Sequence, residues 1–201
     1  MLDRRLLGIG AAVLALAAAG CARREAPATG AVPAVDSAAV TQARQVANEL
    51  GGDLVGLLVA ALDRGGPAEA ISFCADSAQA RTALHQAEGV YVRRVGTRVR
   101  NAANAPDSLE GEILARFAAV MAAGGQPVDT AFVVPRAGGG YELQYARPLF
   151  VMERCVTCHG DAAALAPEVK ALIAGRYPQD AAVGYRAGDL RGAISVRLAM
   201  P

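Results

Sequence analysis

Cys155-Val156-Thr157-Cys158-His159 is the stretch from which the rest of this 201-residue chain can be interpreted. Two thiols at this spacing lie on one turn of chain, where they can add to the two vinyl groups of a haem, and the adjacent imidazole can bind the iron. We therefore predict one covalently bound haem c. Cys155 and Cys158 would form its thioether bonds, and His159 would be the proximal iron ligand.

The N-terminus predicts export and lipidation. Arg4 and Arg5 precede an apolar stretch over residues 6–19, which at about 14 residues is too short to span a membrane. Small residues then lead directly to Cys21, the expected acceptor of a diacylglycerol group. We expect residues 1–20 to be a lipoprotein signal peptide and the mature protein to be anchored through Cys21 on the periplasmic side of a bacterial membrane. The alternative is an ordinary secretory signal and a soluble periplasmic protein.

Beyond the signal peptide, the chain has the length of a single domain. Residues 21–36 are rich in Ala and Pro and show no apolar periodicity, so we expect a flexible tether. Residues 37–201 would form one haem-binding domain. A formal net charge of +1 gives no sign of a nucleic-acid partner.

The same pentapeptide has two other interpretations. A thioredoxin-like redox pair would prefer a strand before it and the N-terminus of a longer helix after it. A zinc site would need about two more Cys or His ligands, and only Cys74 and His85 remain for that role. Export favours haem, because c-type haem is attached outside the cytoplasm.

Hydrophobic periodicity predicts an α+β fold, with helices first and an antiparallel sheet after them. A helix is expected to end at Gly65-Gly66, to bend at Gly51-Gly52, and to be followed by a second helix in which Pro67 occupies the first turn. Asp107 or Ser108 would cap the third helix. The expected helices cover residues 37–64, 68–88, 108–122 and 168–175, with a further short one before Cys155. The expected strands cover residues 90–99, 131–134, 141–146 and 192–198, the middle two forming a hairpin across residues 136–140.

The residues alone leave the sixth position of the iron open. The candidates are Cys74, His85, Met121, Met152, Met200 or no protein ligand. Cys74 and His85 are eleven residues apart on one predicted helix, about 16 Å by helix rise, so only one of them could reach the iron. Cys74 is also the thiol left over once the other three cysteines are assigned, and a lone thiol in an oxidising compartment needs burial or ligation.

From Cys74 to Val196 the chain resembles the c-type haem family with a PAS-like fold, found in bacteria and cyanobacteria as exported proteins and as sensor regions of receptors. Besides the haem motif, the resemblance is carried by Arg94, Arg100-Asn101, Asn104, Pro106-Asp107, Glu110, Tyr145-x-x-Pro148, Tyr177-Pro178-Gln179-Asp180 and Gly184-Tyr185-x-x-Gly188-Asp189-Leu190-Arg191-Gly192-Ala193-Ile194-Ser195. Ala102 and Leu109 depart from the family pattern, which has a proline and an aromatic residue there.

The resemblance implies long N-terminal helices packed on a PAS-like antiparallel sheet, with the haem motif after the central strands. It also implies that the helix cysteine is the distal axial ligand, and this maps onto Cys74. The arginines near the expected strand over residues 90–99 and near the final loop could pair with haem propionates, and two tyrosines could line the haem edge. These residues are Arg94, Arg98, Arg100, Arg191, Tyr177 and Tyr185.

Two functions follow as expectations. The first is single-electron transfer between periplasmic redox partners. The second is haem-based sensing of redox state or of NO or CO, with the signal leaving through a separate partner such as a receptor. Catalysis is less expected, because no positioned acid–base group is evident if Cys74 occupies the iron. No catalytic residue is predicted.

Overall fold

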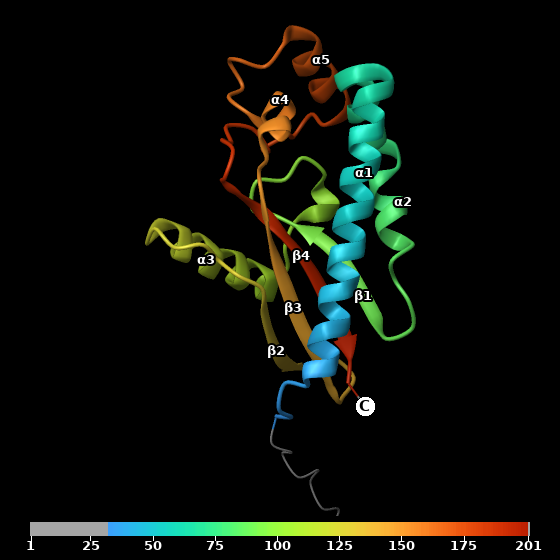
Figure 1. The fold of residues 1–201 in the computed structure, drawn as a ribbon, viewed down its shortest axis with the longest axis vertical. Coiled ribbons are helices and arrows are strands. Elements are labelled where there is room, and N and C mark those ends of the chain that lie inside the picture. Colours follow the sequence, from blue (N-terminus) through green and yellow to red (C-terminus); the bar gives the residue numbers. More distant parts are fainter. Residues whose placement is uncertain (1–31, 201) are drawn as a thin grey trace, which may run out of the picture. The chain divides into compact units, whose positions relative to one another are not determined.

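The computed structural model describes residues 32–200. The expected signal peptide, Cys21 and most of the expected tether lie outside this region. In the described part of the chain, helices pack on a four-stranded antiparallel sheet (Figure 1), which confirms the predicted α+β class.

Two helical arms form a hairpin at the start of the domain. Helix α1 (Ser37–Asp76) has non-helical dihedral angles at Gly65 and Gly66, and the positive φ of 62° at Gly66 suits glycine. The chain reverses there and continues back through residues 67–76 and α2 (Ala78–Ala83), beside the first arm (Figure 1). Asp53 of the first arm pairs with Arg81 of the second arm at 3.0 Å and with His85, just after that arm, at 3.3 Å.

The predicted break at Gly65-Gly66 is confirmed, but the predicted bend at Gly51-Gly52 is wrong. The backbone of α1 stays helical there. A Cβ atom at Gly51 would lie 3.3 Å from Cδ1 of Ile194, so this glycine lets the helix approach the sheet closely. The second arm also ends earlier than expected, since α2 ends at Ala83 and Ser77 interrupts the arm.

The sheet has the strand order β1-β4-β3-β2, and every neighbouring pair is antiparallel. The strands are β1 (Val90–Val95), β2 (Thr130–Pro135), β3 (Tyr141–Phe150) and β4 (Leu190–Ala199). Strands β2 and β3 form the predicted hairpin. Because β3 runs on to Phe150, the helix expected before Cys155 is reduced to one 3₁₀ turn, η2 (Glu153–Cys155). Strand β1 stops at Val95, four residues short of the prediction, and Gly96 then donates its N–H to the carbonyl of Asn104 in the following loop.

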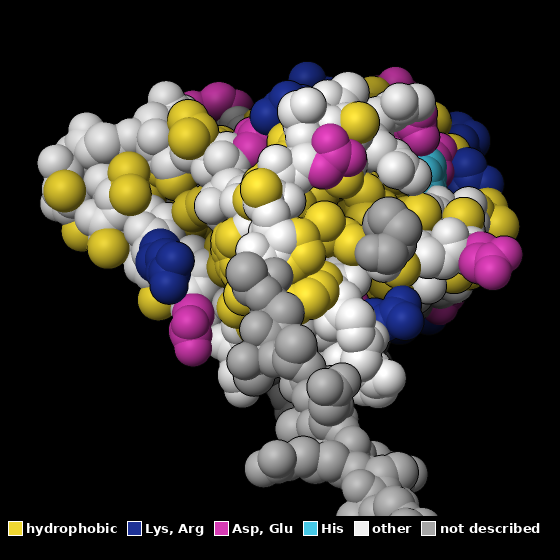
Figure 2. All heavy atoms as spheres, turned by 90° about the horizontal axis from the view of Figure 1, so that it is seen from below, with side chains coloured by type: hydrophobic (Ala, Val, Ile, Leu, Met, Phe, Trp, Pro, Cys, Tyr) yellow, Lys and Arg dark blue, Asp and Glu magenta, His cyan; other side chains and the backbone are white. Residues whose placement is uncertain are grey.

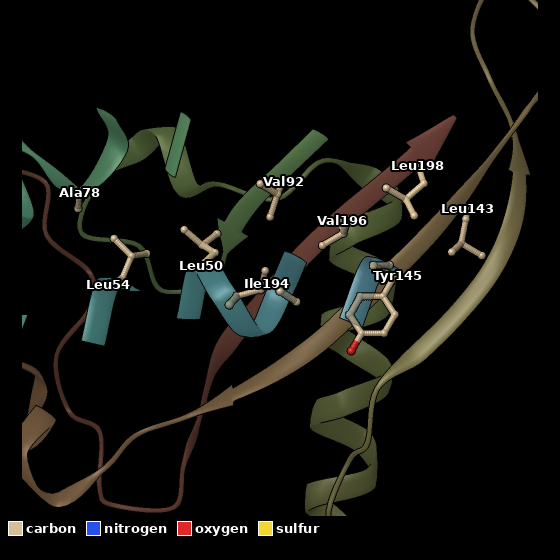
Figure 3. Close-up of a cluster of buried hydrophobic side chains, with 11 residues drawn as sticks. Leu50, Leu54, Ala78, Val92, Leu143, Tyr145, Ile194, Val196 and Leu198 are labelled. Atoms are coloured by element: carbon tan, nitrogen blue, oxygen red, sulfur yellow. The ribbon is translucent and has the colours of Figure 1, made fainter. Parts of the chain in front are cut away.

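Each face of the sheet is covered by helix. The hairpin arms bury Leu50 and Leu54 against Val92, Ile194 and Val196 on one face (Figure 3). On the other face α3 (Ser108–Ala122) packs through Ile113, Leu114 and Phe117. By length and hydropathy α1 could cross a membrane, but its first arm contributes the buried residues Ala43, Ala47, Leu50 and Leu54 to this core. Viewed from the end where α1 begins, the surface mixes apolar side chains with charges of both signs (Figure 2), in keeping with the low net charge.

A buried polar cluster anchors the start of α3. Asp107 is the N-cap, as predicted, and it forms a capping box with Glu110: each side chain accepts the backbone N–H of the other, at 2.9 and 3.0 Å. The Glu110 side chain is fully buried, 3.8 Å from both Arg93 and Arg197. Arg197 also pairs with Asp107. The cap therefore ties α3 to β1 and β4.

We expect Asp107→Ala to lower the free energy of unfolding by about 1 kcal/mol at pH 7, because the first turn of α3 loses its cap. Burial alone would raise the pKa of Asp107, but the Glu110 N–H and Arg197 outweigh it and hold the pKa below its usual value. A lowered carboxyl pKa stabilises the fold above the unfolded value, and this stabilisation is lost as the pH falls through the folded value. Urea unfolding at pH 7 and pH 3 should therefore give a smaller deficit at pH 3.

Asp107→Asn is the control for this prediction, since asparagine caps helices as well as aspartate does but carries no charge. It should retain most of the stability at pH 7. A deficit for the alanine variant that is equally large at both pH values would contradict the assignment.

Candidate functional site

A cavity lies at the end of the sheet where β1 and β3 end and β4 begins. It contains about 1090 Å³ of empty space, part of it open to solvent. Both arms of α1 supply apolar walls through Leu58, Leu62, Ala70 and Ile71. The polar and sulfur-bearing side chains that line it are Cys74, Arg94, Arg100, Asn104, Arg154, Cys155, Thr157, Cys158, His159, Tyr177 and Arg191.

Both cysteines and the histidine of the pentapeptide line this cavity. Cys155 ends η2, and Cys158 and His159 lie on α4 (Val156–His159). Both thiols are free and half-buried. Helix α4 has only four residues, whereas a thioredoxin-like pair prefers a longer helix after it. The described residues contain no group of three or more potential zinc ligands.

His159 is held in one tautomer. Its Nδ1 lies 2.7 Å from the carbonyl oxygen of Ala182. Because a carbonyl can only accept, Nδ1 carries the proton and the Nε2 lone pair is left for another partner. Burial, together with the positive charges of Arg100 and Arg191, lowers the pKa of His159 to about 4. The ring is therefore neutral at pH 7, the form in which imidazole binds a metal.

Arg100 joins the pentapeptide to the loop that supports His159. Its Nε and Nη2 each donate to the Asp180 carboxylate at 3.1 Å, and Nη2 also donates to the carbonyl of Cys158 at 2.6 Å. Both side chains of the pair are only 9% exposed. The same loop is fastened by two backbone bonds, from Gly184 to Gly160 and from Tyr185 to His159. These bonds thus hold His159, the candidate iron ligand, in a fixed position relative to Ala182, which accepts its hydrogen bond.

Tyr185 contacts the ring of His159 but is not among the residues that line the cavity. Its buried ring meets the His159 ring edge-on, with 6.3 Å between centroids. The guanidinium of Arg98 lies 3.6 Å from the Tyr185 centroid, and Arg191 lies at 5.2 Å. Arg98 also donates to the carbonyl of Val183. Arg98 and Arg100 are therefore engaged by protein groups.

Among the candidates for the sixth position, only Cys74 lines the cavity. It lies on the second arm of α1, and burial raises its pKa while Arg94 and Arg100 partly counteract this. His85 instead pairs with Asp53 on the hairpin. Met121 lies on α3, Met152 is exposed, and Met200 packs against the helix-side core. The geometry favours Cys74.

Arg94 faces the same cavity from β1. Its Nε is buried and has no hydrogen-bond partner among residues 32–200. Burial lowers the pKa of both Arg94 and Arg191. Partly buried guanidinium groups that face a cavity suit an anionic ligand.

Three supporting groups were not singled out from the sequence. The Ala182 carbonyl could not be identified from the sequence, because every residue has a backbone carbonyl. Asp180 stands in the final motif, but its pairing with Arg100 spans 80 positions. Arg154 also lines the cavity, because it directly precedes Cys155 in η2.

We expect the buried Arg100–Asp180 pair to be much more important for stability than the exposed Arg176–Asp76 pair. Asp180→Asn should lower the free energy of unfolding by about 3–5 kcal/mol, because it leaves a buried guanidinium without its counter-charge. Asp76→Asn, in a pair whose side chains are 44% and 55% exposed, should cost less than about 1 kcal/mol. Urea unfolding of the two variants tests this, and equal losses would show that Arg100 has other adequate partners.

The Tll0287-like family matches residues 25–199 of the chain. Among solved structures, the chain is similar to the cyanobacterial heme-protein Tll0287, with 21% sequence identity and a TM-score of 0.59. The alignment covers 83% of this chain and 98% of that one. At this identity the similarity shows the fold alone. Among curated proteins no relative is found.

Proposed function

Because the chain belongs to the Tll0287-like family, we propose that it is a haem protein with one covalently bound haem c. Thioether bonds would join the haem to Cys155 and Cys158, with His159 as the proximal and Cys74 as the distal iron ligand. The observation that carries the proposal is that these four side chains line one largely apolar cavity. A PAS-like assignment of the fold is part of the same proposal.

The residues around the cavity fit such a group. The two thiols are free, and His159 keeps an unprotonated Nε2. Arg94 is available for an anion in the cavity, whereas Arg100 is paired with Asp180 and Arg191 donates to the carbonyl of Arg98 at 3.0 Å. We therefore assign Arg100 and Tyr185, both predicted as haem surroundings, to the support of the pentapeptide and of His159.

The bound haem would supply an iron that exchanges single electrons between its ferric and ferrous states. The surrounding side chains would determine which oxidation state of the iron is the more stable. A thiolate from Cys74 is an anionic ligand, so it favours the more highly charged iron and lowers the reduction potential. The apolar side chains of both α1 arms would exclude water from the iron and limit the reorganisation that accompanies electron transfer.

We propose single-electron transfer between periplasmic partners as the physiological role. The protein would be exported, cleaved before Cys21 and anchored to the membrane through that residue. The arrangement supports a carrier because packed elements hold every proposed ligand. His159 is fixed by Ala182 and Tyr185, and Cys74 lies on a helix packed against α5 (Pro167–Arg176) through Ile71.

One observation favours sensing as a second candidate. Cys74 lies on the second arm of the hairpin, and Gly65-Gly66 separates that arm from the first. Release of Cys74 from the iron could move the second arm without unfolding the first. The partner would then be a receptor that binds the hairpin.

We expect mature protein from a host competent in cytochrome maturation to be coloured, with a mass larger than that of the polypeptide by one haem. Its pyridine haemochrome spectrum should be that of a haem with two thioether bonds. Cys155→Ala with Cys158→Ala should abolish covalent attachment, whereas Cys74→Ser, the matched cysteine control, should retain it. Colourless protein at the bare polypeptide mass would refute the proposal.

Replacement of Cys74 should change the iron and leave the thioethers intact. In oxidised Cys74→Ser protein we expect the thiolate-to-iron absorption features to vanish and the reduction potential to rise, because an anionic ligand has been lost. Unchanged spectra would exclude Cys74 as a ligand. Rapid mixing of reduced wild-type protein with CO and NO then separates the two roles: a site that stays closed supports the carrier, and fast binding supports the sensor.

A further inference from the structure

Arg94 is a partly buried cation without a carboxylate partner among residues 32–200, and its Nε is fully buried. Strand β1 alternates its side chains between the two faces of the sheet. Val92 belongs to the helix-side core, so Arg94 lies on that same face, between the sheet and the helical hairpin. Arg93 points to the other face, where it lies 3.8 Å from Glu110 and donates to the carbonyls of Ala103 and Ala105. The two neighbouring arginines therefore have opposite surroundings.

Cys74, Tyr177 and Arg191 line the same cavity as Arg94, and no carboxylate side chain of the described residues lines it. Arg191 repels it, so the favourable partners are the thiol and the phenol. Conversely, the cations that act on Cys74 are Arg94 and Arg100. Arg100 is already neutralised by Asp180. Of Arg94 and Arg100, Arg94 is thus the one whose charge is not balanced by a carboxylate.

A buried guanidinium without a counter-charge destabilises a fold. Because Arg94 faces the cavity, we expect an anion there to balance its charge. The haem propionates are one source, and the thiolate form of Cys74 is another. The second source lies within this chain, and its distance from Arg94 is set by the packing of the second α1 arm on the sheet.

We propose that the Arg94 guanidinium is the counter-charge of the Cys74 thiolate, and that it sets how strongly this sulfur donates to the iron. This inference rests on the proposed haem ligation. A cation beside the sulfur draws electron density away from the iron, so the ferric state is stabilised less than by an isolated thiolate. Arg94 is therefore a positioning residue that acts through Cys74.

The test is a double-mutant cycle on the holoprotein, with the reduction potential as the measurement. Arg94→Gln should lower the potential, because the thiolate becomes a stronger donor. We expect a change in the ferric-to-ferrous equilibrium of at least tenfold, which corresponds to about 59 mV for a one-electron couple. Arg94→Lys should restore most of the potential, since it keeps the charge. In the Cys74→Ser background, Arg94→Gln should have no more effect than the control Arg93→Gln.

Arg93→Gln is matched to Arg94→Gln in strand and in charge change, but it acts on the other face of the sheet. If Arg94→Gln lowers the potential equally with and without Cys74, then Arg94 acts on a propionate and the inference is wrong. If Arg94→Gln and Arg93→Gln have the same effect in the wild-type background, it is also wrong. Arg94→Met, which removes the charge but keeps an unbranched chain, replaces the glutamine variant if that variant binds haem poorly. Failure of the haem proposal itself would appear earlier, as colourless protein.

Discussion

The bidentate ion pair between Arg100 and Asp180 is the interaction on which the site depends. Arg100 follows β1, Asp180 lies in the loop before β4, and the Cys158 carbonyl accepts a third bond from the same guanidinium. Three segments that are far apart in sequence are thereby held at one end of the sheet. With 9% of each side chain exposed, the pair is protected from water, and its loss would leave a buried charge.

The orientation of His159 follows from this constraint. Asp180 also accepts the N–H of Ala182, whose own carbonyl accepts the imidazole proton. The imidazole is thus positioned by a chain of hydrogen bonds that begins at Arg100. Tyr185, held under Arg98, limits rotation of the ring from the other side. This outer layer fixes both the direction and the protonation of the candidate ligand before any metal is bound.

Local patterns predicted much of the fold, and long-range contacts account for what they missed. The Gly65-Gly66 break, the Asp107 cap and the β2–β3 hairpin each depend on neighbouring residues, and all three are confirmed. The bend at Gly51-Gly52 failed because that glycine serves a contact with Ile194, about 140 positions away. For the site, the sequence named Cys74, Cys155, Cys158 and His159 by chemistry and resemblance, and all four line one cavity. It could not separate Arg94 from Arg100, because only the fold pairs one with Asp180 and leaves the other without a carboxylate.

The helical hairpin also determines where the site stands within the domain. Leu58, which lines the cavity, lies 21 positions after the first residue of α1, about 30 Å by helix rise. The cavity is lined by residues of η2 and α4, and α4 lies at the end of the domain away from the start of α1 (Figure 1). For a protein tethered at its N-terminus, α1 would act as a spacer that presents the reactive end to the aqueous compartment. In the proposed anchored form, a redox partner would therefore meet the domain at the end opposite to the start of α1.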